Sequence, residues 1–378
     1  MNNSNLSWVS MWGNAMSISE NRPESYGKNI TLQYRIYCPF TGDKLRISYD
    51  NYCGLDEVHI TTTTVCHKHV FYPVTFAGNT GAAMPAGAGI TSDPVDMPVK
   101  EGDFITVNFY LEGLTELRSS VYACGPLSEG RYCIGDMTEC EEPSINTSRK
   151  TNTYYFLNNI SIYTAGENHA LVCYGDSITA QDWPDYLQLR VKELGIHNLS
   201  IIRRATSGSR ILRQYDNITY ESYGLKGSNR FMHEVPTDGA DAVLIQQGIN
   251  DIIHPVGTDI NPFRPMSDLP TIDELWDGMK YYIDCARSLN YKVYVGTLLP
   301  IEGWRTYADF REILKNEFND RIRTTALTDG CVDFDKAVRN KDNPKAFAPG
   351  LDSGDHLHPS KAGYKQMAGA VPEYILRS

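Results

Sequence analysis

Two patterns of hydrophobic and polar positions divide the chain into halves. In the first half apolar residues alternate with polar ones, most clearly over residues 30–38, 45–49 and 105–111. A period of two gives a strand one buried face and one wet face, which is typical of antiparallel sheets. Turn residues such as those at 41–43 separate these segments. We therefore predict that residues 1–166 form an all-β sandwich with a jelly-roll-like arrangement.

From residue 167 onward the pattern changes to short continuous apolar runs with helical patterns between them. Runs without alternation suit strands that are covered on both faces. They cover residues 170–174, 199–202, 242–245, 293–298 and 331–334. Three segments carry apolar residues at helical spacing: Leu187, Val191 and Leu194; Ile272, Leu275, Met279, Ile283 and Ala286; and Tyr364, Met367, Ala368, Val371 and Ile375. Residues 167–378 are therefore predicted to form an α/β domain, a doubly wound five-stranded parallel sheet with helices on both faces.

A Gly-Asp-Ser motif at 175–177 follows the first predicted strand of this sheet. Because ligands of such sheets bind beyond the carboxyl ends of the strands, Ser177 is placed to face a cleft. Its hydroxyl is a candidate nucleophile, and its backbone N–H is available to a developing oxyanion. The alternative is a turn in which Asp176 and Ser177 only cap the next helix, because turns favour both residue types.

Two more polar motifs follow the second and third predicted strands, at 207–210 and 248–251. Gly208 lets a backbone N–H approach a substrate oxygen closely. Asn250 offers a side-chain amide donor of the kind that stabilises an oxyanion in the transition state. Ordinary turns remain the alternative interpretation of both motifs.

The segment Asp-His-Leu-His at 355–358 precedes the last predicted helix. Asp355 and His358 are three residues apart, so one turn brings them together. Asp355 can then orient an imidazole whose other nitrogen faces Ser177. Asp352 and His356 are four residues apart and offer a second pairing of the same kind. Spacing does not choose between the two pairs.

Composition narrows the classes of partner and compartment. The chain has 378 residues and a formal net charge of -11, which disfavours nucleic acid and anionic membranes as partners. Residues 1–5 are polar and no apolar stretch is long enough to span a bilayer, so we expect a cytoplasmic protein whose nine cysteines are free thiols. We expect no cofactor and no metal. The Cys-His-Lys-His cluster at 66–69 is assigned structural or exposed roles, and the histidine pair at 356 and 358 has no third ligand of suitable spacing.

In this order the motifs at 175–179, 208, 248–251 and 355–359 resemble the SGNH, or GDSL, hydrolase superfamily. The resemblance covers the whole second half, including residues 362–364. Residues 8–13, 45–51 and 92–95 resemble, more faintly, the β-sandwich that precedes some GDSL esterases. One departure is Ser209, where related sequences often have Asn. The resemblance implies the following roles: Ser177 as nucleophile, His358 as base, Asp355 as its orienting carboxylate, and the backbone amides of Ser177 and Gly208 with the Asn250 side chain as the oxyanion hole.

Several such two-domain enzymes remove acetyl groups from plant polysaccharide fragments. The resemblance therefore predicts a serine esterase that deacetylates xylan- or mannan-type oligosaccharides through an acyl-enzyme. Trp304, Tyr307 and His356 are the expected substrate contacts, although Trp304 can equally pack the base of its own loop. The β half is expected to bind glycan, to complete the cleft or to shield the sheet. The alternatives are a general short-chain acyl esterase or lysophospholipase, and a non-catalytic glycan-binding protein.

Overall fold

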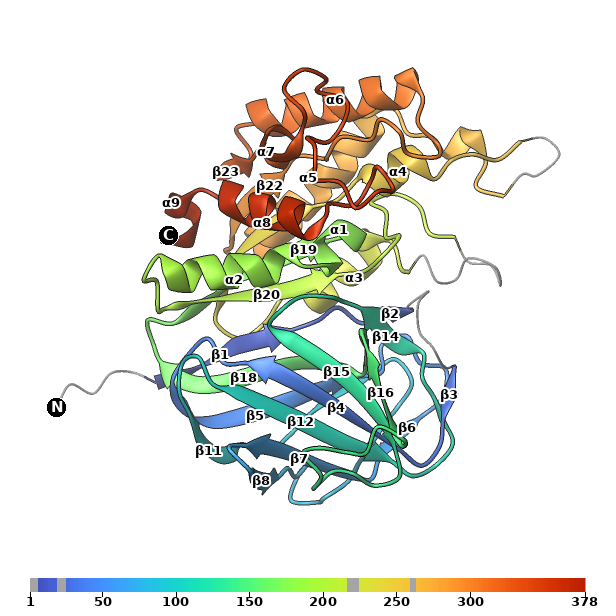
Figure 1. The fold of residues 1–378 in the computed structure, drawn as a ribbon. Helices are drawn as coiled ribbons and strands as arrows, with labels where there is room; N and C mark the ends of the chain where they lie inside the picture. Colours follow the sequence, from blue (N-terminus) through green and yellow to red (C-terminus); the bar gives the residue numbers. More distant parts are fainter. Residues whose placement is uncertain (1–5, 19–24, 216–223, 259–262, 378) are drawn as a thin grey trace.

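The first half of the chain folds into two antiparallel sheets that pack face to face (Figure 1). The computed structural model describes residues 6–18, 25–215, 224–258 and 263–377. One sheet has the order β1-β18-β5-β10 with β11 beside β5: β1 (Leu6–Gly13), β18 (Leu157–Ala165), β5 (Gly42–Asp50), β10 (Gly89–Thr91) and β11 (Val95–Val99). The other has the order β16-β15-β4-β12-β7-β8: β16 (Ser148–Thr151), β15 (Ser128–Ile134), β4 (Ile30–Tyr37), β12 (Phe104–Leu111), β7 (Thr62–His67) and β8 (Val70–Pro73). Shorter strands complete this half: β2 (Ser17–Ile18), β3 (Tyr26–Gly27), β6 (Val58–Ile60), β9 (Ala82–Met84), β13 (Thr115–Glu116), β14 (Ser119–Tyr122) and β17 (Thr153–Tyr155).

The alternation along β4 matches its burial only in part. Leu32, Tyr34 and Ile36 face the sandwich core, as the period of two predicts. The polar residues between them were expected in water, but Thr31 and Gln33 are buried as well. A loop at 135–140 covers this outer face, and its carbonyl oxygens accept hydrogen bonds from both side chains. Buried polar side chains are tolerated there because they are hydrogen-bonded.

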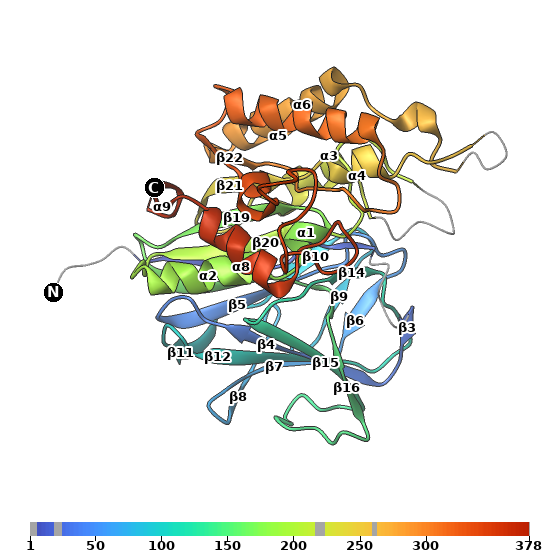
Figure 2. The same ribbon diagram turned by 45° about the horizontal axis from the view of Figure 1, so that its top comes forward.

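The second half is a five-stranded parallel sheet with helices on both faces, as the continuous apolar runs predict. The strand order is β20-β19-β21-β22-β23: β20 (Leu199–Ala205), β19 (His169–Gly175), β21 (Ala240–Gln246), β22 (Lys292–Gly296) and β23 (Gly330–Val332). Its helical segments are α1 (Ser177–Ala180), α2 (Trp183–Glu193), α3 (Gly227–Glu234), α4 (Ile249–Ile253), the 3-10 segment η2 (Met266–Asp268), α5 (Ile272–Ser288), α6 (Asp309–Thr324), α7 (Phe334–Val338), α8 (Lys361–Ala370) and α9 (Glu373–Leu376). Helices α2 and α8 lie on one face of the sheet, and α3 and α5 lie on the other (Figure 2).

Two predicted elements have different bounds in the structure. The last helical pattern, from Tyr364 to Ile375, is two helices, because Pro372 cannot continue α8 and instead precedes α9. The fifth strand ends at Val332, since Asp333 accepts a hydrogen bond from the backbone N–H of Lys336 and caps α7. Neither difference changes the order of the elements.

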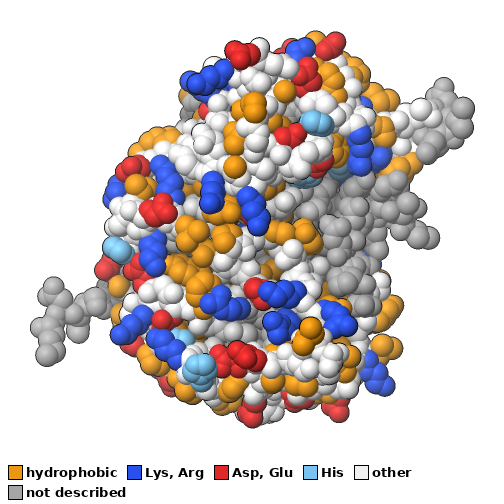
Figure 3. Space-filling model, viewed as in Figure 1, with side chains coloured by type: hydrophobic (Ala, Val, Ile, Leu, Met, Phe, Trp, Pro, Cys, Tyr) orange, Lys and Arg blue, Asp and Glu red, His pale blue; other side chains and the backbone are white. Residues whose placement is uncertain are grey.

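The two halves are joined along β1 and β20, which lie side by side. The Ser200 hydroxyl donates to the Ser10 carbonyl oxygen at 2.6 Å. Arg204, at the end of β20, is almost fully buried and donates to the Asn158 carbonyl at 2.7 Å and to Asn159 Oδ1 at 3.0 Å. On the face shown in Figure 3, hydrophobic side chains gather around α2, where the α/β half meets the sandwich. These contacts place the end of β14 beside the carboxyl edge of the parallel sheet.

Candidate active site

Ser177 directly follows Asp176 after the carboxyl end of β19, the strand between β20 and β21, as the first motif predicts. A Cβ atom on Gly175 would come within 2.5 Å of the Gln246 carbonyl oxygen, so only glycine fits the close approach of β19 to β21 here. The next residue, Asp176, is the N-cap of α1 and accepts a hydrogen bond from the Ile178 backbone N–H at 3.1 Å. This cap begins the helix at Ser177 and presents its side chain at the edge of the sheet.

His358 is the histidine that reaches this serine. Its Nε2 atom lies 2.8 Å from Ser177 Oγ, and its Nδ1 atom lies 2.6 Å from Asp355 Oδ2. The other carboxylate oxygen of Asp355 accepts the backbone N–H groups of Leu357 and His358 at 2.9 and 2.8 Å. Burial raises the pKa of Asp355, but the hydrogen bonds from His358 outweigh it and hold this pKa well below its ordinary value. The carboxylate is therefore ionised and positioned to orient the ring.

The second pairing that the spacing allows also forms, but away from the serine. His356 Nδ1 lies 2.6 Å from Asp352 Oδ2. His356 has a left-handed φ of 64°, and its ring packs against Gly303 on the side where a Cβ atom would point. His356 does not line the cavity beside Ser177. The two pairs have equal hydrogen-bond lengths, so position rather than pairing distinguishes them.

The predicted oxyanion donors lie on the two neighbouring loops. Gly208 has a left-handed φ of 76° and lines the cavity beside Ser177, together with Asn250. One hydrogen of the Asn250 amide is donated to the Ser209 carbonyl at 3.0 Å, which fixes the plane of the amide. An amide nitrogen carries two hydrogens, so the second remains to donate. The three predicted donors therefore surround one small space.

The residue that departs from related sequences, Ser209, is turned away from this space. Its side chain is fully buried and accepts a hydrogen bond from Gln247 Nε2 at 2.9 Å. It donates to the Leu225 carbonyl, also at 2.9 Å. Only its backbone takes part in the site, through the carbonyl oxygen that holds Asn250. The serine at 209 therefore changes the support of the loop and not the wall of the cavity.

Buried charges hold the loops of the site together. Asp251 accepts the backbone N–H groups of Ile211 and Leu212 at 2.8 and 2.9 Å, which ties the loop after β20 to the start of α4. Burial raises the pKa of Asp251 to about 6, against the lowering effect of these two bonds. Arg230 of α3 is fully buried, pairs with Glu234 and donates to the Gly175 carbonyl at 2.7 Å. The strand end before Ser177 is thus supported from behind.

The cavity beside Ser177 has a volume of about 220 Å³. Trp304 lines it, as predicted, but Tyr307 does not; its hydroxyl lies 3.3 Å from Asp309 Oδ1 instead. Four lining residues lie outside the motifs and candidate residues found in the sequence, and Tyr122 among them comes from the sandwich: Tyr122, Gln181, His254 and Arg305. The His254 ring is buried beside Arg210, and burial with the nearby arginines lowers its pKa well below the ordinary value. His254 is therefore a neutral hydrogen-bonding group in the wall.

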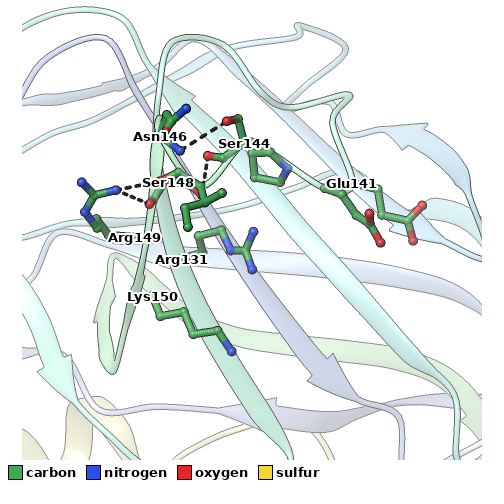
Figure 4. Close-up of a pocket in the computed structure, with 10 residues that line it drawn as sticks. Arg131, Glu141, Ser144, Asn146, Ser148, Arg149 and Lys150 are labelled. Atoms are coloured by element: carbon green, nitrogen blue, oxygen red, sulfur yellow. Dashed lines mark hydrogen bonds between the residues drawn. The ribbon is translucent and has the colours of Figure 1, made fainter.

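A larger hollow of about 880 Å³ lies on the sandwich, between β15 and the loop before β16 (Figure 4). Arg131 and Lys150 extend from neighbouring strands on one side of it, and Glu141 lies on the other. The Ser144 hydroxyl accepts the backbone N–H of Asn146, a bond internal to the loop. The residues that line this hollow include serines but no histidine, so none of its hydroxyls is paired with an imidazole base there as Ser177 is.

Two further findings bear on the predictions. In the parts of the chain that the structure describes, no helix is long and apolar enough to cross a bilayer. Within the same residues no three His, Cys, Asp or Glu side chains gather as a metal site would require. The histidines of the 66–69 cluster instead contact carboxylates: His67 lies 2.9 Å from Asp103, and His69 lies 2.7 Å from Glu141.

The α/β half of the chain matches a known protein family. The model of the GDSL-like lipase/acylhydrolase family matches residues 173–366. Among solved structures the chain is similar to an acetyl xylan esterase at 21% identity over 55% of this chain and 99% of that one, with a TM-score of 0.40. A lipase/acylhydrolase from Enterococcus faecalis matches at 18% identity over 55% and 96%, with a TM-score of 0.40. An acetylxylan esterase from Geobacillus stearothermophilus matches at 18% identity over 53% and 91%, with a TM-score of 0.39. No curated protein sequence matches the chain.

Proposed function

The chain belongs to the GDSL-like lipase/acylhydrolase family, a family of ester hydrolases, and from this premise we propose that it removes acetyl groups from oligosaccharides of the xylan or mannan type through an acyl-enzyme. The observation that carries the proposal is the hydrogen bond of 2.8 Å between Ser177 Oγ and His358 Nε2, at the wall of a small cavity. A serine hydroxyl needs such a base to become a nucleophile at neutral pH.

The chemistry follows from the arrangement of the side chains. Ser177 Oγ attacks the acetyl carbonyl carbon while His358 Nε2 takes the hydroxyl proton. Asp355 keeps the ring oriented and stabilises the imidazolium that forms. The backbone N–H groups of Ser177 and Gly208 and the free hydrogen of the Asn250 amide donate to the oxyanion. His358 then returns its proton to the leaving sugar oxygen, and a water molecule attacks the acetyl-serine by the reverse sequence.

The size and lining of the cavity support a short acyl group on a polar alcohol. A volume of about 220 Å³ lies below the range of about 300–1,000 Å³ that is typical of sites for drug-sized ligands. An acetyl group fits such a space, whereas a long acyl chain needs an apolar groove. Gln181 and Arg305 supply polar groups beside the indole of Trp304, a combination that suits a sugar with both polar and apolar faces.

Assays of ester hydrolysis and acetate release test this proposal. The native protein should hydrolyse p-nitrophenyl acetate, prefer it to the octanoate, and release acetate from acetylated xylan or mannan oligomers. Ser177→Ala should abolish turnover, whereas Ser288→Ala, at an exposed serine on α5, should leave it unchanged. A preference for the octanoate would favour a lipid esterase instead. Binding of glycans without any turnover would favour a non-catalytic protein.

A further inference from the structure

A second cavity adjoins the one beside Ser177. It has a volume of about 450 Å³ and lies between the sandwich and the α/β half; we call it the junction cavity. Gln181 lines both cavities. Three short segments contribute lining residues to both cavities: residues 122–126 from the end of β14 onward, residues 181–182 before α2, and residues 357–361 around His358. The junction cavity is lined by Cys124, Gly125, Pro126, Asn152, Gln181, Asp182, Tyr186, Ser353, Pro359, Ser360, Lys361 and Tyr364.

The sandwich side of the junction cavity is fixed in place by hydrogen bonds to the α/β half. The Cys124 backbone N–H donates to the Ala180 carbonyl at 3.1 Å. The Leu127 N–H donates to Asp185 Oδ2 at 2.8 Å, and the other oxygen of Asp185 lies 2.6 Å from Arg203. The wall therefore stands in position before any ligand arrives, which reduces the entropy that binding has to overcome.

Two buried polar side chains that line the junction cavity have no side-chain hydrogen bond within the described residues. Asp182 is 8% exposed, and in the described parts of the chain its carboxylate has neither a hydrogen bond nor an ion pair. Arg203 and Lys361, which lines the same cavity, act on this carboxylate as nearby positive charges. Tyr364 is 2% exposed, and its hydroxyl oxygen, which has no hydrogen-bond partner among the residues described, is itself enclosed by the protein. The Asp182 carboxylate is therefore the group of this wall that can accept a hydrogen bond from a ligand.

We propose that the junction cavity binds the neutral sugar unit next to the acetylated one, so that the substrate is an oligosaccharide held across both halves of the protein. The proposal rests on the function proposed above. A sugar hydroxyl can donate to the Asp182 carboxylate. A sugar with its own carboxylate would be repelled by Asp182, and an acyl chain would leave this carboxylate without a hydrogen bond. The amides of Asn152 and Gln181 add polar groups to the lining, and Gln181 also lines the cavity beside Ser177.

The number of sugar units in the substrate tests this inference on the unmodified protein. We would measure kcat/KM for acetate release from acetylated methyl xyloside and acetylated xylotetraose, and from the corresponding mannose pair. The tetraose should exceed the monosaccharide by roughly tenfold for the sugar that is hydrolysed, the factor expected of a hydrogen bond to a charged group. Equal values for both lengths would overturn the inference.

Variants then assign the preference to the junction cavity. Asp182→Ala should lower the ratio of tetraose to monosaccharide activity several-fold, toward unity. The matched control is Asp284→Ala, at an exposed position on α5, which should keep the native ratio. A native ratio in Asp182→Ala would overturn the inference even if the length preference exists.

Hydrolysis of p-nitrophenyl acetate separates this inference from the function on which it rests. Turnover of p-nitrophenyl acetate and of both sugar lengths at one rate leaves the esterase in place and removes only the junction subsite. If the native protein releases acetate from neither sugar ester, the proposed function fails and the inference fails with it.

Discussion

Two histidines in one loop offer a matched test of how the site works. His356 and His358 each lie 2.6 Å from an aspartate, but only His358 also reaches Ser177. We would compare His358→Ala with His356→Asn. Asparagine is chosen at 356 because the residue there has a left-handed φ of 64°, which Asn adopts more readily than Ala.

The structure sets the expected size of each effect. Among the described residues His358 Nε2, at 2.8 Å, is the base positioned to take the proton from Ser177 Oγ. In serine hydrolases the loss of the base lowers kcat by up to about 10⁶-fold, which is about 8 kcal/mol of barrier at about 1.4 kcal/mol per tenfold. The His356 side chain is 51% exposed, and an exposed ion pair contributes about 0.2–1 kcal/mol to stability. His356→Asn should therefore change kcat by less than about threefold, because its ring has no path to the serine.

The assay is steady-state hydrolysis of p-nitrophenyl acetate by the two variants and the native protein. Thermal unfolding of each variant shows whether it is folded before its kcat is compared. Loss of activity in both variants to the same degree would contradict the assignment, because it would mean that the loop as a whole and not one imidazole is needed. Retention of kcat by folded His358→Ala would refute the role of His358 as base.

Three other changes test the oxyanion donor, the buried ion pair and the buried acid before the serine. Asn250→Ala should lower kcat by about 100- to 1,000-fold with little change in KM, since one oxyanion donor is lost. Arg230→Met should lower the free energy of unfolding in urea by about 3–5 kcal/mol, because Glu234 is left as an uncompensated buried charge. Burial raises the pKa of Asp176 to about 7, so its contribution to stability is present below its unfolded pKa of about 4 and is lost as the pH rises through about 7. In Asp176→Asn the free energy of unfolding should therefore fall less between about pH 5 and about pH 8 than in the native protein.

Much of the fold could be predicted because its periodicities are local. Five apolar runs correspond to the five strands of the parallel sheet, although their spatial order is not visible in the sequence. Helix α6 is not among the three helices that apolar spacing identifies. Its buried face carries Arg311, Lys315 and Asn319 as well as hydrophobic residues, so its hydrophobic pattern is interrupted. The burial of polar residues on β4 depends on a loop 100 residues away and leaves no local signal.

The residues of the site could likewise be predicted only where the signal is local in the sequence. Ser177, Asn250 and the 355–358 segment could be found because each belongs to a short motif at the end of a strand or the start of a helix. Tyr122 could not, since its position beside Ser177 depends on how the sandwich docks. Tyr307 follows the fourth predicted strand as Trp304 does, but a tight turn directs its side chain toward Asp309 and it does not line the cavity.

The docking of the sandwich is itself an argument about function. Arg204 is a buried cation whose hydrogen bonds go to backbone and amide oxygens of the sandwich, so separating the halves would expose it together with the surfaces it joins. A buried guanidinium is costly unless it is hydrogen-bonded. In the described chain Arg204 Nε has no partner, whereas the terminal nitrogens donate to the sandwich, so the docked geometry is the one that satisfies them. That geometry puts Tyr122 into the cavity wall beside Ser177 and Cys124 into the wall of the junction cavity. The α/β half alone would keep Ser177, His358 and their donors but would lose one side of both cavities, so the proposed selection of a sugar would require both halves.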